Sequence, residues 1–311
     1  MKTRGRVFVW VVGLLCAIAA VTVVLALRAP EPSADALHEF GPQAASAVAA
    51  LRTATGDPGT RGRPSAARAL LCTQSEMRDG AIIRGPESAK DIALVFTGHS
   101  FAEGGETILN DLAKYKAKGS FFFTGEFYAN TNFASLIQRI AKDGHYLGPH
   151  SDQHLLYCPW SGPKTSLVSR VEFRTDLEAN LQKIERFGVK RTEIRYFLPP
   201  YEHYNQEIAA WTAELGMTLI NFTPGTRSGA DYTGEADKNF VPSQVIFDSI
   251  LKKEREDPNG LNGFILLLHI GSGPGRADKF HARFGELLDV LAAKGYQFVR
   301  VDELLEPKGT K

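Results

Sequence analysis

From about residue 88 onward, short apolar runs alternate with longer stretches whose apolar residues recur every three or four positions. The short runs have the length of β-strands, and the longer stretches have the period of amphipathic helices. This alternation favours an α/β fold, and we expect a distorted (β/α) barrel with about seven parallel strands over residues 88–305. The predicted strands are 92–96, 120–124, 146–149, 193–197, 218–222, 264–269 and 297–301, and the predicted helices are 106–116, 133–142, 171–187, 205–214, 242–256 and 280–294.

An uncharged run at residues 7–27 precedes this region. As a helix it would be about 30 Å long, which is the hydrocarbon thickness of a bilayer. Basic residues lie before the run and acidic residues follow it, so the amino end is expected to stay cytoplasmic. We expect residues 1–28 to form an uncleaved anchor, with the main domain periplasmic or extracellular; a secreted form after signal-peptide cleavage is the alternative.

The remaining segments are expected to carry little structure of their own. Residues 29–87 are rich in Ala, Pro, Gly and Ser and are predicted to be a tether, and residues 306–311 a tail. In an oxidising compartment Cys72 and Cys158 would form a disulfide, although two unrelated thiols are an equal alternative. The net charge of +1 offers no field that would attract nucleic acid.

Polar residues gather where the predicted strands end. Thr97–His99 follows the first strand, His150–His154 the third, Tyr201–Glu202 the fourth, Asp231 the fifth, and His269 ends the sixth. The carboxyl ends of barrel strands form one face, which is where such folds place their active sites. These residues are therefore predicted to meet at one mouth.

The strongest chemical signal is a pair of histidines four residues apart. In a helical turn, His150 and His154 would lie on one face and would be able to share a metal ion. A packing coincidence is the alternative for an isolated pair.

Two motifs make the chain resemble the polysaccharide deacetylases, the NodB-homology family also called carbohydrate esterase family four, over about residues 88–305. The family motif H-[ST]-x-x-H is matched by His150, Ser151 and His154, and Leu-x-Leu-His is matched by Leu266–His269. The resemblance implies a NodB-like barrel, a divalent metal with zinc as the expected ion, and removal of acetyl groups from an N- or O-acetylated envelope or extracellular glycan.

The chain departs from the family at its first motif. Where the family has T-F-D-D-G, this chain has Val95–His99, so both aspartates are absent. In the family the first is the catalytic base and the second a metal ligand, which Thr97 and Gly98 cannot replace directly. The arginine of the family's R-P-P-Y segment is also missing, since Leu198 stands there.

Three interpretations follow. In the first, an active hydrolase uses His99 as the third metal ligand beside His150 and His154. The second is a catalytically inactive, glycan-binding relative. The third is a hydrolase of a different bond, because fold alone does not fix the reaction.

If the site is active, another carboxylate must act as base. The candidates are Asp152, Glu202 and Asp231, and His269 would be the general acid. Each has a structural alternative, such as stabilising a turn or a loop or orienting a metal-binding histidine. Aromatic side chains near the predicted mouth suit either sugar stacking or loop packing; they are Tyr157, Trp160, Tyr201, Tyr204 and Tyr232.

Overall fold

The computed structural model describes residues 74–306, in which helices and strands alternate as predicted. The strands are β1 (Glu76–Arg78), β2 (Ala81–Arg84), β3 (Asp91–Gly98), β4 (Ser120–Phe123), β5 (Tyr146–Pro149), β6 (Tyr196–Phe197), β7 (Thr218–Leu219), β8 (Phe264–His269) and β9 (Gln297–Val299). The helices are α4 (Gly105–Lys114), α5 (Gly125–Ala129), α6 (Ala134–Lys142), α7 (Arg170–Glu185), α8 (Gln206–Glu214), α9 (Ser243–Glu256), α10 (Phe284–Ala293) and α11 (Val301–Leu305), with 3-10 turns η2 (Thr131–Phe133), η3 (Arg191–Glu193), η4 (Pro200–Glu202), η5 (Ser228–Ala230) and η6 (Phe280–Arg283).

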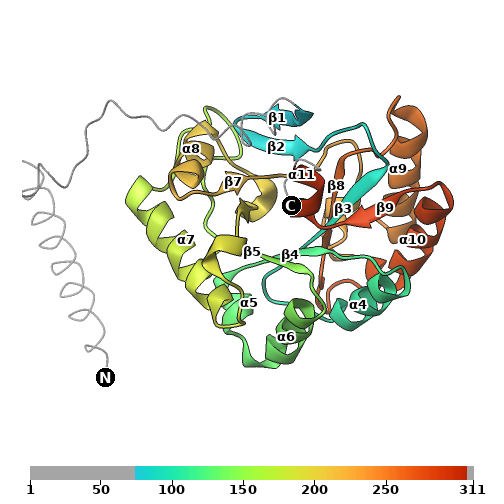
Figure 1. The fold of residues 1–311 in the computed structure, drawn as a ribbon, viewed down its shortest axis with the longest axis horizontal. Coiled ribbons are helices and arrows are strands. Elements are labelled where there is room, and N and C mark those ends of the chain that lie inside the picture. The colour runs from blue at the N-terminus through green and yellow to red at the C-terminus, as the bar shows by residue number, and fades with distance from the viewer. Residues whose placement is uncertain (1–73, 307–311) are drawn as a thin grey trace, which may run out of the picture. The chain divides into compact units, whose positions relative to one another are not determined.

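Most of the strands form a half-barrel sheet in the order β1-β2-β8-β3-β4-β5, with β9 paired to β3 (Figure 1). Strand β3 is parallel to β4, β8 and β9, and β4 is parallel to β5. Strand β2 is antiparallel to both β1 and β8. Residues 76–84 were expected to belong to the tether, so the prediction of parallel strands alone is wrong for β1 and β2.

Strands β6 and β7 form a separate parallel pair that lies between β5 and β2. On one side, the Leu198 amide donates to the carbonyl of Pro149 in β5 at 3.4 Å. On the other side, the Asn221 amide donates to the carbonyl of Ile82 in β2 at 2.8 Å. The barrel is distorted because β6 and β7 are joined to its other strands by isolated hydrogen bonds and not by a continuous ladder.

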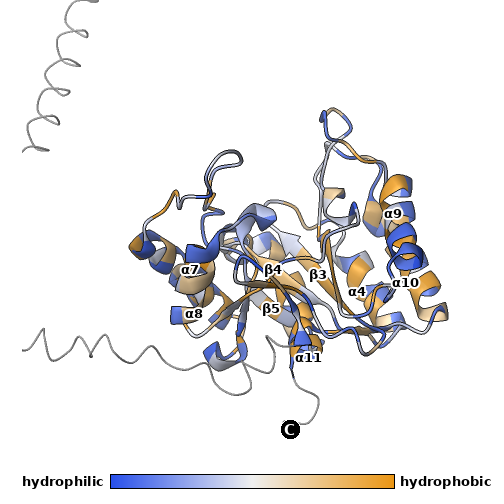
Figure 2. Cartoon of the chain, turned by 90° about the horizontal axis from the view of Figure 1, so that it is seen from above, coloured by the Kyte–Doolittle hydropathy of each residue, from blue (hydrophilic) through white to orange (hydrophobic). Residues whose placement is uncertain are grey.

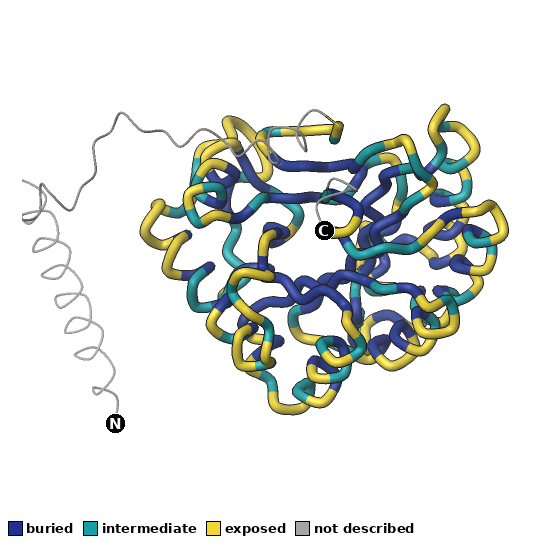
Figure 3. The backbone as a smooth tube through the Cα atoms, in the orientation of Figure 1, coloured by how far each residue is buried: buried dark blue, intermediate teal, exposed yellow. Residues whose placement is uncertain are grey.

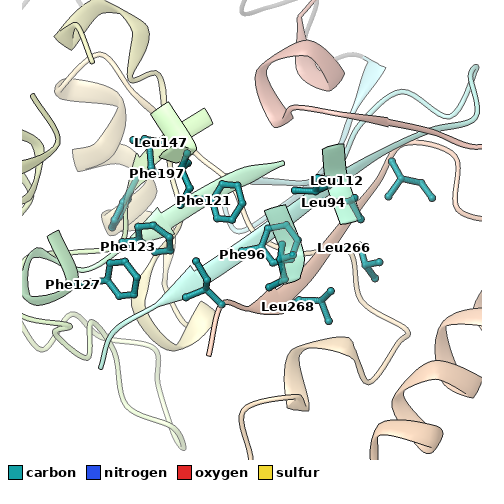
Figure 4. Close-up of a cluster of buried hydrophobic side chains, with 14 of the residues drawn as sticks. Leu94, Phe96, Leu112, Phe121, Phe123, Phe127, Leu147, Phe197, Leu266 and Leu268 are labelled. Carbon is teal, nitrogen blue, oxygen red and sulfur yellow. The ribbon is translucent and has the colours of Figure 1, made fainter. Parts of the chain in front are cut away.

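The central strands are apolar along their whole length because both of their faces are buried. One face packs against the surrounding helices, as Phe96, Phe121 and Leu266 do in Figure 4. The other face points into the barrel, where residues such as Val95 and Leu267 form a second core cluster. Full burial of each such side chain contributes roughly 1.5–3 kcal/mol to folding.

The helices surround the sheet, and their exposed residues lie on the outer side (Figures 1 and 3). Helices α9 and α10 mix hydrophilic and hydrophobic residues along their length, as amphipathic helices do (Figure 2). Helix α11 contributes Val301 and Leu305 to the cluster inside the barrel. Helix α11 therefore covers part of the apolar interior, and the polar residues lie at the carboxyl ends of the strands.

Two predictions concern segments beyond this range. The apolar run at residues 7–27 lies outside the described residues, and among residues 74–306 no helix has the length and apolar character that crossing a bilayer requires. Cys158 is a buried free cysteine in the structure, which does not support the expected pairing, and Cys72 lies outside the described residues. The anchor stays a prediction.

Candidate active site

Residues from four strand ends line one cavity of about 630 Å³. Thr97 comes from β3, His150 follows β5, Glu202 lies in η4 after β6, and His269 ends β8. The structure thus brings together side chains that are as much as 172 positions apart, at the barrel face where the sequence placed them. The full lining consists of Thr97, Gly98, His99, Ser100, Phe101, His150, His154, Trp160, Tyr201, Glu202, Tyr232, His269, Gly271 and Ser272.

The two histidines of the His150–His154 pair lie on a loop, not on the helical turn that was predicted. Ser151 and His154 have positive φ angles of 69° and 55°, in the left-handed region that non-glycine residues seldom adopt. The two imidazole centroids are 5.3 Å apart. Backbone strain of this kind persists only where surrounding contacts hold it in place.

Helix α7 supplies those contacts through two buried polar side chains. Asp176 accepts hydrogen bonds from the amides of Asp152 and Gln153, both at 2.9 Å. Asn180 accepts from the His150 amide at 2.9 Å and donates to the Phe123 carbonyl at 3.3 Å. Neither residue was predicted from the sequence, although their spacing of four places two polar groups on the buried face of a helix.

We expect Asn180→Leu to lower the free energy of unfolding by about 1–3 kcal/mol, because the buried amide and carbonyl lose their partner. Denaturant unfolding of the variant and wild type measures the difference. Asn132→Leu, at an exposed position, is the matched control and should stay within about 0.5 kcal/mol of wild type. Equal stability of all three proteins would contradict the supporting role of Asn180.

Both histidines of the pair are neutral imidazoles at neutral pH. Burial, together with the neighbouring His154, holds the pKa of His150 well below its usual range. Burial, followed by the charges of His99 and His269, lowers the pKa of His154 to about 4. Metal ligands must be unprotonated, so these shifts suit a metal site.

His150 also has the orientation of a ligand. Its Nδ1 lies 2.9 Å from the carbonyl of Leu198, so Nδ1 is the protonated nitrogen and Nε2 carries the free lone pair. A hydrogen bond of this type fixes metal-binding imidazoles in most proteins.

His99, the predicted third ligand, lies beside His154 with ring centroids 4.8 Å apart. The two rings are stacked at an interplanar angle of 15°, so in this arrangement they do not face a common ion. Nδ1 of His99 contacts the Thr124 hydroxyl at 3.1 Å, and Nε2 lies 3.5 Å from the exposed carboxylate of Glu126.

The donor set fits a divalent metal in its chemistry. Within residues 74–306, however, no three His, Cys, Asp or Glu side chains already converge as a metal-binding group. The His99 and Glu126 side chains are 39% and 65% exposed, so His99 has room to turn its Nε2 toward the other two rings.

His269 forms a tight pair with Asp231. Its Nδ1 donates to the Asp231 carboxylate at 2.6 Å, and its backbone amide donates to the other carboxylate oxygen at 2.9 Å. Burial acts to lower the pKa of His269, but the charges of Asp231 and Glu202 prevail and raise it. His269 can therefore hold a proton on the nitrogen that Asp231 does not contact, as a general acid requires.

Glu202 is the predicted base candidate whose own side chain lines the cavity. Burial, opposed by His269 and reinforced by Asp231, raises its pKa to about 7. Tyr201 and Glu202 have positive φ angles of 58° and 52°, and the Asn221 side chain donates to the Glu202 carbonyl at 2.7 Å. A carboxyl group with a raised pKa on a strained turn is typical of a group with a catalytic role.

The other two base candidates have different surroundings. Asp231 is occupied by His269, as described. Asp152 lies outside the cavity lining and pairs with Lys183 at 2.6 Å. These contacts favour a positioning role for Asp231 and a structural one for Asp152.

The five aromatic residues divide into two groups. Trp160, Tyr201 and Tyr232 line the cavity and are 65%, 43% and 50% exposed. Tyr157 and Tyr204 are buried in the protein core. Only the first group offers flat faces to a ligand, in line with the stacking alternative for those three residues.

The amino-acid sequence is similar to those of known proteins. Residues 84–220 match the family model of polysaccharide deacetylase. A peptidoglycan-N-acetylglucosamine deacetylase of Bacillus cereus is 27% identical over 224 residues, which are 72% of this chain and 92% of the relative. The peptidoglycan-N-acetylmuramic acid deacetylase PdaA of Bacillus subtilis is 23% identical over 223 residues, covering 71% of this chain and 74% of PdaA.

Solved structures agree on the fold. A carbohydrate esterase family 4 pseudoenzyme from Bacillus anthracis superposes with a TM-score of 0.56 at 20% identity, covering 74% of this chain and 70% of its own. Bacillus subtilis PdaA, a family 4 carbohydrate esterase, also superposes with a TM-score of 0.56 at 20% identity, covering 76% of this chain and 88% of its own. At such identities these likenesses concern the fold alone.

Proposed function

We propose, from the match of residues 84–220 to the family model of polysaccharide deacetylase and from the similarity to peptidoglycan deacetylases, that this chain is a metal-dependent hydrolase that removes acetyl groups from a glycan. The observation that carries the proposal is one cavity lined by neutral His150 and His154, by Glu202, and by the His269 that Asp231 holds. Peptidoglycan is the first substrate to test, because relatives of this chain are named for its deacetylation.

In this proposal His150 and His154, with His99 as the third ligand, would hold the divalent metal, most simply zinc. When bound, the metal would supply a Lewis acid that polarises the acetyl carbonyl. The neutral state of both buried imidazoles supports this assignment.

Glu202 and His269 would move the protons. Ionised Glu202 takes a proton from the attacking water while the oxygen of that water bonds to the acetyl carbon. His269 gives its proton to the leaving nitrogen or oxygen as the C–N or C–O bond breaks. Acetate and a free amine or hydroxyl result, and Asp231 keeps the His269 ring in the orientation that this transfer needs.

The apolar run at residues 7–27 would tether the domain outside the cytoplasm, where envelope glycans lie. The exposed faces of Trp160, Tyr201 and Tyr232 would stack on sugar rings.

The experiment incubates the purified chain with peptidoglycan, with N-acetylated chitotetraose and with an O-acetylated xylan, and measures released acetate. Acetate release that stops on addition of a metal chelator is the expected result. Release of fragments without acetate would support a hydrolase of another bond in place of deacetylation.

A second candidate is a non-catalytic, glycan-binding protein. It is favoured by the replacement of both motif aspartates by Thr97 and Gly98, and by the absence of a converged three-ligand group within residues 74–306. Under this alternative chitotetraose binds, no acetate is released, and His150→Ala leaves the affinity unchanged.

A further inference from the structure

A second, smaller cavity adjoins the candidate active site. It has a volume of about 390 Å³ and includes Arg227 and Asn239 in its lining. Tyr201, Glu202 and Tyr232 line both cavities and therefore form a common wall between them. We call the smaller cavity the side pocket. A glycan whose acetylated sugar lies in the active-site cavity would reach the side pocket with a neighbouring sugar or one of its substituents.

Arg227 is the one lysine or arginine among the described residues that line these two cavities. Its side chain is exposed and has no hydrogen-bond or ion-pair partner within residues 74–306. Lysines of the surrounding loops and helices differ in this respect, since Lys183 pairs with Asp152 and Lys279 with Glu103. An unpaired arginine suits an anionic ligand, because its planar guanidinium can donate two parallel hydrogen bonds to a carboxylate.

The acidic side chains of the same region have other partners. Asp237 accepts from a backbone amide of its own loop at 2.7 Å, and Glu235 accepts from two amides of the loop after β8 at 2.7 and 2.9 Å. Glu202 lines the side pocket as well, but the charges that act on its pKa are those of His269 and Asp231. The guanidinium of Arg227 is therefore left to a ligand.

The backbone of Arg227 is held in place beside the candidate active site. Its amide donates to the Ser249 hydroxyl of α9 at 2.9 Å, and its carbonyl accepts from the Ala230 amide at 3.0 Å. Arg227 lies directly before the turn η5, and Asp231 lies directly after it. Because Asp231 binds His269, this short turn connects the cation of the side pocket to the proposed general acid.

We propose that the side pocket binds an anionic group of the glycan through Arg227, so that the preferred substrate is an acetylated glycan whose sugars carry carboxylates. This inference rests on the proposed function, because it names the substrate class of the same site. Tyr201 and Tyr232 in the common wall offer exposed aromatic faces to the sugars between the two cavities. Asn239 adds an amide that can donate to the same carboxylate or to a sugar hydroxyl.

The test measures the affinity of the purified protein for three tetrasaccharides by surface plasmon resonance, in which fresh glycan is supplied continuously. Chitotetraose is neutral. The tetrasaccharide of alternating N-acetylglucosamine and N-acetylmuramic acid has the same backbone with added lactyl carboxylates, and hyaluronan tetrasaccharide carries the carboxylates of uronic acid. We expect one acidic glycan to bind about fivefold more tightly than chitotetraose, the upper end for an exposed ion pair. The preference should weaken as salt is added.

Two arginine variants assign the preference to the side pocket. Arg227→Gln is expected to bring the affinity for the acidic glycan down to that for chitotetraose. Arg174→Gln changes an exposed arginine of α7 that lines neither cavity, so it should keep the wild-type preference. The acidic glycan that binds more tightly identifies the source of the carboxylate.

Equal affinity of wild type for all three glycans overturns the proposal, and so does a preference that persists in Arg227→Gln. Binding is measured independently of turnover, so the two hypotheses fail separately. Preferential binding without acetate release from any of the three glycans counts against the proposed function and supports the role of Arg227.

Discussion

Replacing Glu202 with glutamine is expected to lower kcat about 10²–10⁴-fold, which is the range that a general base contributes. The substitution keeps the shape of the side chain and removes its ability to accept a proton. Glu202 lines the cavity with a pKa raised to about 7. Acetate release under saturating substrate measures the effect.

A general-base role for Glu202 also predicts how activity changes with pH. A base must be ionised, so wild-type activity should rise as the pH increases through about 7, the pKa of Glu202. It should fall again where His269 loses its proton, above the ordinary pKa of a histidine because Asp231 raises it. In Glu202→Gln the rising limb disappears, and the falling limb moves to lower pH because the charge of Glu202 no longer supports His269.

As the pH rises through about 7, we expect activity to increase and the contribution of Glu202 to the stability of the fold to decrease. Since the pKa of Glu202 is raised in the folded protein, ionisation of this group opposes folding. This unfavourable contribution is absent below about pH 4.5 and fully present above about pH 7. Glu202→Gln should therefore melt higher than wild type at pH 8 and by a smaller margin at pH 5.

Asp152→Asn is the matched control for the base. Its carboxylate pairs with Lys183 outside the cavity, so we expect a much smaller loss of kcat and an unchanged rising limb. If Asp152→Asn abolishes the rising limb and Glu202→Gln keeps it, the assignment of Glu202 is wrong.

His150→Ala is expected to remove bound metal from the protein. Its imidazole is buried and oriented by Leu198, and no described side chain replaces it at the cavity wall. The metal content per chain after growth in zinc-supplemented medium is the measurement, with about one ion expected for wild type.

Two further variants sharpen this prediction. His99→Ala should also lose metal if His99 turns to become the third ligand; full metal content would show that His99 is not a ligand. His281→Ala changes a histidine that does not line the cavity, so it should retain the ion. Equal metal content in His150→Ala and wild type would contradict the histidine site.

The strands of this fold were readable because most of them are buried on both faces. Apolar runs such as Phe264–His269 and Tyr146–Pro149 coincide with β8 and β5 at both ends. Strands β1 and β2 escaped detection because they are short and lie in a Gly- and Arg-rich context. The pairing of β2 with β8 joins residues about 180 positions apart, which no local pattern announces.

Some features of the candidate site could be predicted from the sequence and others could not. Residue types and strand order pointed to the cavity residues His150, Glu202 and His269. The positive φ angles at Ser151 and His154 depend on contacts from α7, 23 to 30 positions away in the chain. Tertiary support of this kind outweighs the helical geometry that the spacing of the two histidines suggested.

Metal dependence is tested most directly by measuring acetate release from chitotetraose by wild-type protein in three states: as purified, after removal of metal by a chelator, and after reloading with zinc. We expect activity that disappears with the metal and returns with zinc, and that His150→Ala cannot recover. Turnover that is the same in all three states would contradict the metal-dependent mechanism. Glycan binding without acetate release in any state would establish the non-catalytic alternative.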